Sequence, residues 1–266
     1  MTASASDRAY QLLFDKAGRD NVSLVSRLTI GLTWTACSLE STVAEGAVTD
    51  LGLAMTLGPT SRTLPWSGTL AGQPVKALAQ WLDSWNTIEA AVGLATVNST
   101  INGVSNQLLA QATRLTPGQH PNLAVFEHFK PQLMGEKVVV IGHYPGISDC
   151  LSDLDVCILE RSPSPTDLPD TAAEYLIPKA DWVFITASSL INKTFPRLAT
   201  LAENANTVMM GPSTPWLQEW EDFGINYLAG VVIANPEKTQ QIAAEGGGVR
   251  LFEEGGVDYA LAKIGD

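Results

Sequence analysis

The sequence predicts an α/β protein in which a small α+β domain is followed by a larger domain built on a parallel sheet. In the N-terminal part, strand-like segments are followed by two helix-like segments, which is the order of an α+β domain. From residue 138 to residue 216, apolar strands, polar turns and short helices alternate, as in a parallel sheet with helical crossovers. We expect the first domain to span residues 1–115 and the second to span residues 116–266.

In the first domain, apolar residues at helical spacing predict a helix over residues 7–16. A segment rich in Val, Ile and Thr then predicts a strand over residues 24–39. A strand over residues 51–57 and a loop over residues 58–68 follow. Two helices are then predicted over residues 74–82 and 87–97, and a linker between the domains over residues 108–129. The linker assignment rests on the proline and glycine residues of that segment.

In the second domain, apolar runs bounded by polar turns predict strands over residues 137–141, 155–159, 182–185, 207–210, 227–233 and 249–252. A polar residue before a proline predicts helix starts at Thr214 and Asn235, and Thr194 precedes a further start. Gly224 and Gly246 are predicted to end two of these helices. Strand–helix–strand units of this kind require right-handed crossovers and a sheet buried on both faces.

The composition indicates a folded protein and argues against several partners. Of the 266 residues, 45% are hydrophobic and 17% are charged, which suits a chain with a substantial core. The net charge of −12 repels phosphate groups, so we expect no nucleic-acid or membrane partner. The sequence shows no apolar stretch of about 20 residues and no signal-peptide pattern, so we expect a cytoplasmic protein. The three cysteines form no CxxC pair, which argues against disulfides and a cysteine-rich zinc site.

Polar residues gather where the predicted parallel strands end. In an open parallel sheet these carboxyl ends line the ligand crevice, so we expect a ligand to bind there. The candidate ligand-binding residues are Gly142, His143, Tyr144, Pro145, Glu160, Thr186, Ser188, Asn192, Thr194, Gly211, Pro212, Ser213 and Thr214. Asn98 is a further candidate because it is polar among apolar residues, and it either caps its helix or reaches the domain interface.

Several of these candidates have two interpretations. Glu160 follows Gly142 at about the spacing at which an acidic residue holds a ribose hydroxyl, but the GxGxxG fingerprint is absent. The alternative is that Glu160 pairs with Arg161 or another basic group. The hydroxyl groups of residues 186–194 and 211–214, together with Lys193, either bind an anionic or polyhydroxylated ligand or form ordinary turns and caps.

His143 is a candidate metal ligand, proton carrier or hydrogen-bonding wall of a pocket, and we favour the pocket wall. A metal pair with Cys150 is disfavoured. Ile147, Cys150 and Leu151 share one face of a short predicted helix, which places Cys150 in the core. Cys157 lies in an apolar run and is also expected in the core.

Short motifs in a fixed order resemble a known family. They are Gly142-His143-Tyr144-Pro145, Asp167-Leu168-Pro169-Asp170, Ala180-Asp181, Ile185-Thr186, Gly211-Pro212-Ser213 and residues 190–194 in the second domain, and residues 31–35, 52–54 and 93–98 in the first. These motifs resemble DUF364, a family named for heavy-metal chelation, and its usual companion DUF4213. The resemblance implies an enolase-N-terminal-like domain, a Rossmann-like domain and a cleft between them. The name of the family also suggests a transition or heavy metal as cofactor, for which His143 is the candidate metal ligand named above.

Three functional hypotheses follow. The first is a binding protein for a small molecule or metal complex, in which a chelated heavy metal fits better than a bare ion because the chain has few soft ligands. The second is an enzyme or sensor that acts on a small anionic or nucleotide-like metabolite, although no nucleophile elbow, P-loop or HExxH spacing is present in the sequence. The third is a structural or assembly role, and a homo-oligomer is an open alternative.

Overall fold

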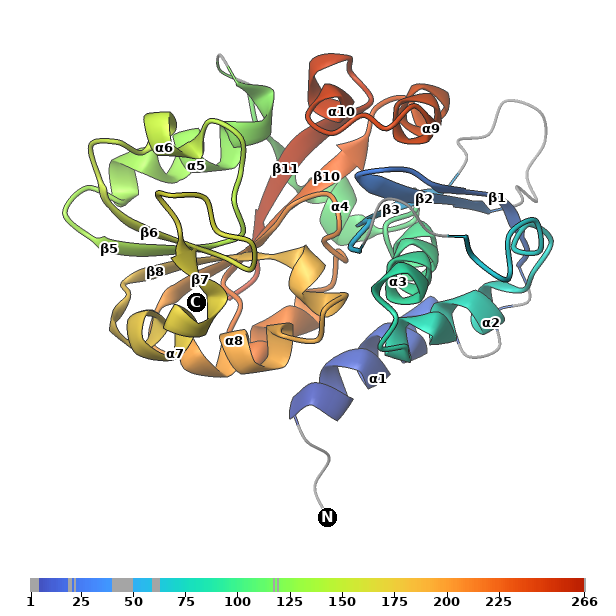
Figure 1. Cartoon of the computed structure of the whole chain (residues 1–266), viewed down its shortest axis with the longest axis horizontal. Coiled ribbons are helices and arrows are strands. Elements are labelled where there is room, and N and C mark those ends of the chain that lie inside the picture. The colour runs from blue at the N-terminus through green and yellow to red at the C-terminus, as the bar shows by residue number, and fades with distance from the viewer. Residues whose placement is uncertain are drawn as a thin grey trace.

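The computed structural model describes residues 5–18, 21, 23–39, 50–58, 63–116, 118 and 120–265. These residues form two lobes (Figure 1). The small lobe surrounds a three-stranded antiparallel sheet, and the large lobe surrounds an eight-stranded mixed sheet. The predicted α/β class, with a smaller sheet before a larger one, is confirmed. Within the described residues, no helix combines the length and the apolar character needed to cross a bilayer.

The small lobe consists of α1 (Ala5–Ala17), β1 (Val25–Ile30), β2 (Trp34–Leu39), β3 (Leu51–Met55), α2 (Val75–Ala79) and α3 (Thr87–Ile101). The single strand predicted over residues 24–39 is wrong, because the chain reverses after Gly31. The N–H of Gly31 donates to the carbonyl of Trp34 at 3.0 Å, and β1 and β2 pair in antiparallel fashion. The loop predicted over residues 58–68 lies partly outside the described residues.

Helix α3 packs closely on β3 at Gly52. A Cβ atom at this position would lie 2.1 Å from both the carbonyl oxygen of Ala95 and the backbone nitrogen of Ser99. Almost every residue of α3 between Ile88 and Ser99 is buried, which agrees with its apolar sequence. The glycine therefore allows the helix and the strand to meet backbone to backbone at the centre of the small lobe.

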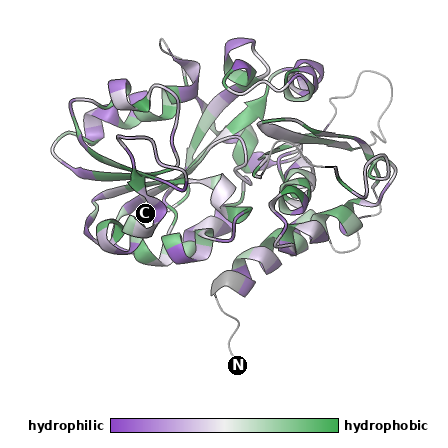
Figure 2. Ribbon diagram, viewed as in Figure 1, coloured by the Kyte–Doolittle hydropathy of each residue, from purple (hydrophilic) through white to green (hydrophobic). Residues whose placement is uncertain are grey.

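The large lobe carries α4 (Gln107–Gln111), β4 (Thr113–Arg114), α5 (Ala124–Phe129), β5 (Lys137–Ile141), α6 (Ile147–Cys150), β6 (Asp155–Glu160), β7 (Leu168–Pro169), α7 (Ala173–Leu176), β8 (Trp182–Thr186), α8 (Phe195–Leu201), β9 (Asn206–Met210), β10 (Tyr227–Ile233), α9 (Pro236–Ala244), α10 (Arg250–Glu253) and β11 (Val257–Lys263). The sheet order is β4-β11-β10-β9-β8-β5-β6-β7. Strands β5 to β10 run parallel, as predicted, and their hydrophobic residues dominate the middle of the lobe (Figure 2). Strand β11 is antiparallel to β10, and β4 is antiparallel to β11.

Two predicted segments of the second domain differ from the structure. The strand predicted over residues 249–252 is helix α10, and the last strand is β11. The linker predicted over residues 108–129 is wrong, because this segment folds into α4, β4 and α5. Phe126 and Phe129 of α5 lie 5.2 Å from Phe184 and 5.3 Å from Trp182, so this segment covers the sheet.

The predicted helix starts have three outcomes. Asn235 caps α9 as predicted, because its side-chain oxygen accepts from the N–H of Lys238 at 3.0 Å. Thr194 precedes α8, but its hydroxyl donates to Asn192 instead of capping the helix. Thr214 does not start a helix; the next helical turn is a 3-10 helix over Gln218–Phe223, which ends at Gly224 as predicted.

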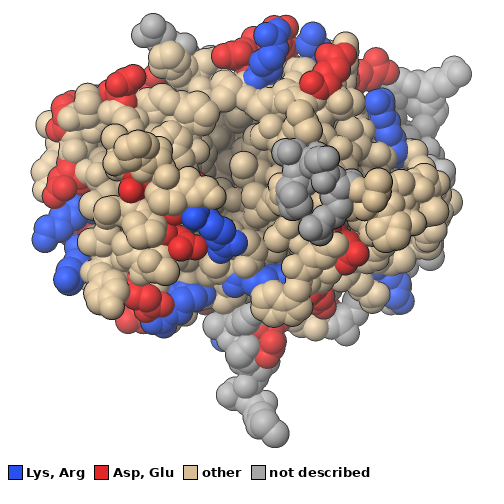
Figure 3. Space-filling model, in the orientation of Figure 1, with Lys and Arg blue, Asp and Glu red and all other residues tan. Residues whose placement is uncertain are grey.

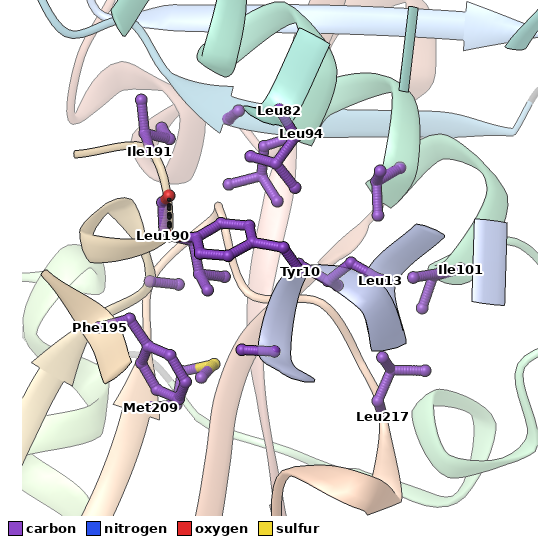
Figure 4. Close-up of a cluster of buried hydrophobic side chains, with 14 of the residues drawn as sticks. Tyr10, Leu13, Leu82, Leu94, Ile101, Leu190, Ile191, Phe195, Met209 and Leu217 are labelled. Atoms are coloured by element: carbon purple, nitrogen blue, oxygen red, sulfur yellow. Dashed lines mark hydrogen bonds between the residues drawn. The ribbon is translucent and has the colours of Figure 1, made fainter. Parts of the chain in front are cut away.

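A hydrophobic cluster around α1 joins the two lobes (Figure 4). Tyr10 and Leu13 of α1 meet Leu190 and Phe195 of the large lobe, and the Tyr10 hydroxyl donates to the Leu190 carbonyl at 2.8 Å. These side chains are almost completely buried. The contact therefore fixes the two lobes against each other through a shared core.

Three asparagines along and beyond α3 hold the buried segment 213–216 of the large lobe. Asn98 donates to the carbonyls of Leu53 and Ser213 at 2.8 and 2.9 Å, so it reaches the interface, which is the second of its two predicted roles. Asn102 donates to the Thr214 carbonyl and accepts from the N–H of Trp216, both at 2.9 Å. Asn106 donates to the Trp216 carbonyl at 2.8 Å. This asparagine ladder, formed by residues 98, 102 and 106, supplies the partners of a segment that joins no helix or strand.

Candidate functional site

The candidate site is a cleft between the two sheets with a volume of about 1170 Å³. The large sheet reverses its strand order between β5 and β8, and in open parallel sheets ligands bind outside the carboxyl ends of the strands at such a point. The ends of β5, β6, β8 and β9 form one wall of the cleft, and Thr33, Trp34 and Met55 of the small lobe contribute to the other. Figure 3 shows the surface hollowed between the two lobes.

The structure brings most of the predicted site residues together in the cleft lining: Gly142, His143, Tyr144, Pro145, Glu160, Thr186, Ser188, Asn192, Thr194, Gly211, Pro212 and Ser213. Thr214 and Asn98 lie outside this lining, because they belong to the contact between the lobes. These residues meet although they are far apart in the sequence, because parallel strands deliver their carboxyl ends to one edge of the sheet.

His143 is oriented by a buried carboxylate. Its Nδ1 atom lies 3.1 Å from both carboxylate oxygens of Asp167, whose side chain is only 1% exposed. Burial alone would raise the pKa of Asp167, but hydrogen bonds from Ser164 and the contact with His143 lower it below its usual value. An ionised Asp167 favours the His143 tautomer that carries hydrogen on Nδ1 and leaves the Nε2 lone pair free.

Glu160 accepts backbone hydrogen bonds and has no basic side chain as a partner among the described residues. Its carboxylate accepts from the N–H groups of His143 at 2.9 Å, Arg161 at 2.7 Å and Ser162 at 3.3 Å. The guanidinium of Arg161 instead pairs with Asp170. The predicted pairing of Glu160 with Arg161 therefore occurs through the main chain, and Glu160 braces the loop that carries His143.

Much of the hydroxyl-rich lining makes turn and interface contacts, which is the second of its predicted roles. Thr186 and Ser188 bond to each other at 2.9 Å, and Asn192 accepts from the Thr194 hydroxyl at 2.6 Å. The Ser213 hydroxyl accepts from the N–H of Met55 at 2.8 Å across the two lobes. These groups shape the cleft, and a ligand would have to share or replace their hydrogen bonds.

Tyr144 differs from these residues because its hydroxyl is buried without a hydrogen-bond partner among the described residues. Its ring packs edge-on against Phe126 at 5.3 Å. Burial raises the pKa of Tyr144 above its usual value, although Thr186 moderates the shift, and the nearby charge of Glu160 raises it further. Tyr144 is therefore a neutral phenol that can donate a hydrogen bond.

Among the described residues, three cationic side chains line the cleft. Arg161 and Arg197 pair with Asp170 and Glu174 respectively, which also belong to the lining. Lys193 is held in a left-handed conformation with φ of 67°, and its ammonium donates to the Leu82 carbonyl and lies 4.9 Å over the Tyr10 ring. Burial lowers the pKa of Lys193 to about 8, against the effect of Asp83.

The described residues contain no group of three or more His, Cys, Asp or Glu side chains that could hold a metal ion. Cys150 and Cys157 are half-buried instead of fully buried as predicted, because α6 is a single turn and β6 lies near the edge of the sheet. Burial raises the pKa of both thiols, which disfavours the thiolate that metals require. Of the His and Cys side chains among the described residues, His143 is the one in the cleft lining.

Sequence reasoning missed Asp167 and Arg197 as site residues. Asp167 stands within a motif that resembles the DUF364 family, but only the fold places it beside His143, which precedes it by 24 positions. Arg197 lies on α8, whose start the sequence did predict. Helical spacing alone does not show that this position faces the mouth of the cleft.

The fold and the cleft define a class of two-sheet α/β proteins with a large crevice at the carboxyl ends of parallel strands. The chain belongs to the DUF364 family, whose model, described as "Putative heavy-metal chelation", matches residues 124–262. The DUF4213 model, with the same description, matches residues 10–101. The predicted family is therefore confirmed for both parts of the chain.

Solved structures of two relatives support this assignment. A DUF364 protein of unknown function from Desulfitobacterium hafniense DCB-2 is 26% identical, with a TM-score of 0.81 over 96% of this chain and 98% of its own. Another from Pyrococcus horikoshii is 21% identical, with a TM-score of 0.77 over 98% of this chain and all of its own, and shows the fold alone. An uncharacterised protein of Methanocaldococcus jannaschii is 28% identical over 134 residues, which are 47% of this chain and 52% of that protein. The chain thus spans about half the length of this curated relative.

Proposed function

We propose that this protein binds a heavy or transition metal as a metal complex, with Nε2 of His143 entering the coordination sphere. The observation that carries the proposal is the contact of His143 Nδ1 with both oxygens of the buried Asp167 carboxylate. Metal-binding histidines commonly donate their second nitrogen to such a carboxylate, which fixes the ring and makes the free nitrogen a better ligand.

The size and chemistry of the cleft favour a complex over a bare ion. A volume of about 1170 Å³ is in the range of sites for organic molecules or larger. Transition-metal sites made by protein alone need several His, Cys or carboxylate ligands, and the described residues offer no such group. A chelator that supplies the remaining ligands resolves this mismatch. The description of the family model, putative heavy-metal chelation, is consistent with a chelated metal as the ligand.

The same cleft is also proposed as the site under the alternative hypothesis of an enzyme or sensor for a small anionic metabolite. Lys193, Arg161 and Arg197 in the lining support an anionic ligand. The nucleotide-like version has less support, because the Glu160 carboxylate that would hold a ribose accepts three backbone N–H groups. We further propose the boundary between residues 115 and 116 and the enolase-N-terminal-like and Rossmann-like assignments of the two parts.

The test uses Cu²⁺–iminodiacetate, a complex whose chelator provides nitrogen and carboxylate oxygen and leaves room for one imidazole. The chain has three histidines, and His120 and His128 are exposed, so a reference protein carries H120Q and H128Q. We expect this reference to bind the complex in calorimetry, H143Q in the same background to lose binding, and D167N to weaken it by about 10–100-fold.

Native mass spectrometry with elemental analysis of protein purified without chelators provides the independent measurement. A bound metal together with an organic mass supports the proposal. An organic mass without metal, combined with equal affinity of H143Q and the reference for Cu²⁺–iminodiacetate, would contradict it and favour the metabolite hypothesis. Thermal unfolding of each variant shows whether a loss of binding reflects loss of the fold.

A further inference from the structure

The hydroxyl of Tyr144 is a buried polar group at the strand-order reversal that makes no hydrogen bond within the described residues. Buried hydroxyls in folded proteins nearly always have a partner, because an unpaired one loses its hydration without compensation. Phe126 packs against the ring edge-on, which limits how far the phenol can turn to find a partner elsewhere. The group therefore suits a partner that arrives with the ligand.

Two glycines keep space open beside this phenol. Gly142 and Gly211 end β5 and β9 with φ of 100° and 103°, and both belong to the cleft lining. A Cβ atom at Gly211 would lie 3.8 Å from the Tyr144 hydroxyl oxygen. A Cβ atom at Gly142 would lie 3.3 Å from Thr186 Cγ2 and 3.9 Å from Tyr144 Cε2. Side chains at either position would narrow the approach to Tyr144.

We infer that the recess bounded by Gly142, Tyr144, Thr186 and Gly211 binds a carboxylate oxygen of the chelator, with the Tyr144 hydroxyl as hydrogen-bond donor. The metal in this inference rests on the proposed function, whereas the recess itself rests on the unpaired hydroxyl and the two glycines. A metal-bound carboxylate oxygen keeps part of its negative charge and accepts a hydrogen bond, while the metal offsets most of the charge of the complex as a whole. It is therefore compatible with the nearby Glu160, whose own charge is met by backbone N–H groups.

His143 and Tyr144 are neighbours in the loop after β5, and both line the cleft, so one complex would be within reach of both side chains. The imidazole would recognise the metal and the phenol would recognise the chelator. Selectivity for oxygen-bearing chelators over nitrogen-only chelators is the functional consequence.

The test compares two complexes in the H120Q/H128Q background. Cu²⁺–iminodiacetate carries carboxylate oxygens, whereas Cu²⁺–diethylenetriamine carries only amine nitrogens and leaves similar room for an imidazole. We expect Y144F to weaken the first complex by about 10-fold or more, since it loses a hydrogen bond to a charged group, and to leave the second unchanged. H143Q is expected to lose both.

Thermal unfolding of the unliganded protein provides a second readout. Y144F removes no internal hydrogen bond, so we expect an equal or higher Tm. The control Y10F removes the bond to the Leu190 carbonyl and is expected to lower it. Equal effects of Y144F on both complexes, or no effect on either, would overturn the recess while leaving a loss in H143Q to support the proposed function. Retained binding in H143Q with a selective loss in Y144F would overturn the proposed function and keep the recess. If neither complex binds to the reference protein, the proposed function and the recess are both overturned.

Discussion

Removal of the Asn102 side chain is expected to destabilise the contact between the lobes. In N102A, the Thr214 carbonyl loses its donor and the Trp216 N–H loses its acceptor, both at 2.9 Å in the native protein. Thr214 and Trp216 are each 1% exposed, so water reaches these backbone groups poorly. A buried backbone group without a partner costs about 1–3 kcal/mol, and we expect N102A to lower the free energy of unfolding by about 2–4 kcal/mol.

Thermal unfolding measures this effect directly. For a domain of this size, each kcal/mol corresponds to about 2–4 °C, so a decrease in Tm of about 5–15 °C is expected. The control is N204A, which truncates an exposed asparagine and should change the free energy of unfolding by less than about 0.5 kcal/mol. If N102A is as stable as N204A, the asparagine ladder does not hold segment 213–216 and the reasoning is refuted.

Two further predictions concern the core and the charge at the interface. G52A is expected to lower the free energy of unfolding by about 2–4 kcal/mol, because the new Cβ would lie 2.1 Å from backbone atoms of α3 that cannot give way. The control is G248A, where a Cβ would have its nearest neighbour at 3.7 Å. Urea unfolding compares the two variants, and equal stability would contradict the packing argument. The pKa of Lys193 is lowered from 10.5 to about 8, so between these pH values the unfolded chain binds more protons than the folded one. We therefore expect the stability of the wild type relative to K193M to rise with pH. The expected rise is about 1–2 kcal/mol, because partial exposure of Lys193 reduces the effect. Urea unfolding at about pH 7.5 and about pH 9.5 tests this, and a flat or falling difference would show that burial does not oppose the charge.

The sequence predicts those parts of the fold whose cause is local. Asn235 bonds to the N–H of Lys238, three positions later, and this spacing is readable without the fold. The parallel strands are recognisable because each is an apolar run bounded by polar turns. Burial on both faces then follows from the helices between the strands.

The reversals of chain direction were not predictable in the same way. Gly31 is one glycine in a run rich in Val, Ile and Thr, so the run indicates strand but does not show that it contains two strands. Strand β11 is not predicted because four of its seven residues are Asp, Ala or Lys, which are depleted in strands, whereas Val249 before α10 and Phe252 within it are residue types that indicate a strand. Thr214 does not start a helix because tertiary hydrogen bonds from the asparagine ladder hold its segment in an irregular conformation.

The cleft residues were predictable as a set, but their individual roles depend on distant contacts. Glu160 matches the spacing of a ribose-binding acid, yet its carboxylate is occupied by N–H groups of residues 143, 161 and 162. A carboxylate has about four lone-pair sites, so these three bonds leave little capacity for a ribose hydroxyl. Spacing shows where a side chain lies along the sheet edge, whereas function depends on which of its atoms stay unpaired.

Under the proposed function, the loop after β5 carries the groups that recognise the ligand. Glu160 braces the backbone of His143, and Asp167 fixes its ring, so both acids limit the motion of the residues after β5. Within the described residues, the side-chain groups of this loop that make no hydrogen bond are His143 Nε2 and the Tyr144 hydroxyl, and both residues line the cleft. Groups fixed in advance lose little entropy when a ligand binds. A metal complex that matches both groups at once would therefore bind more tightly than one that matches either alone.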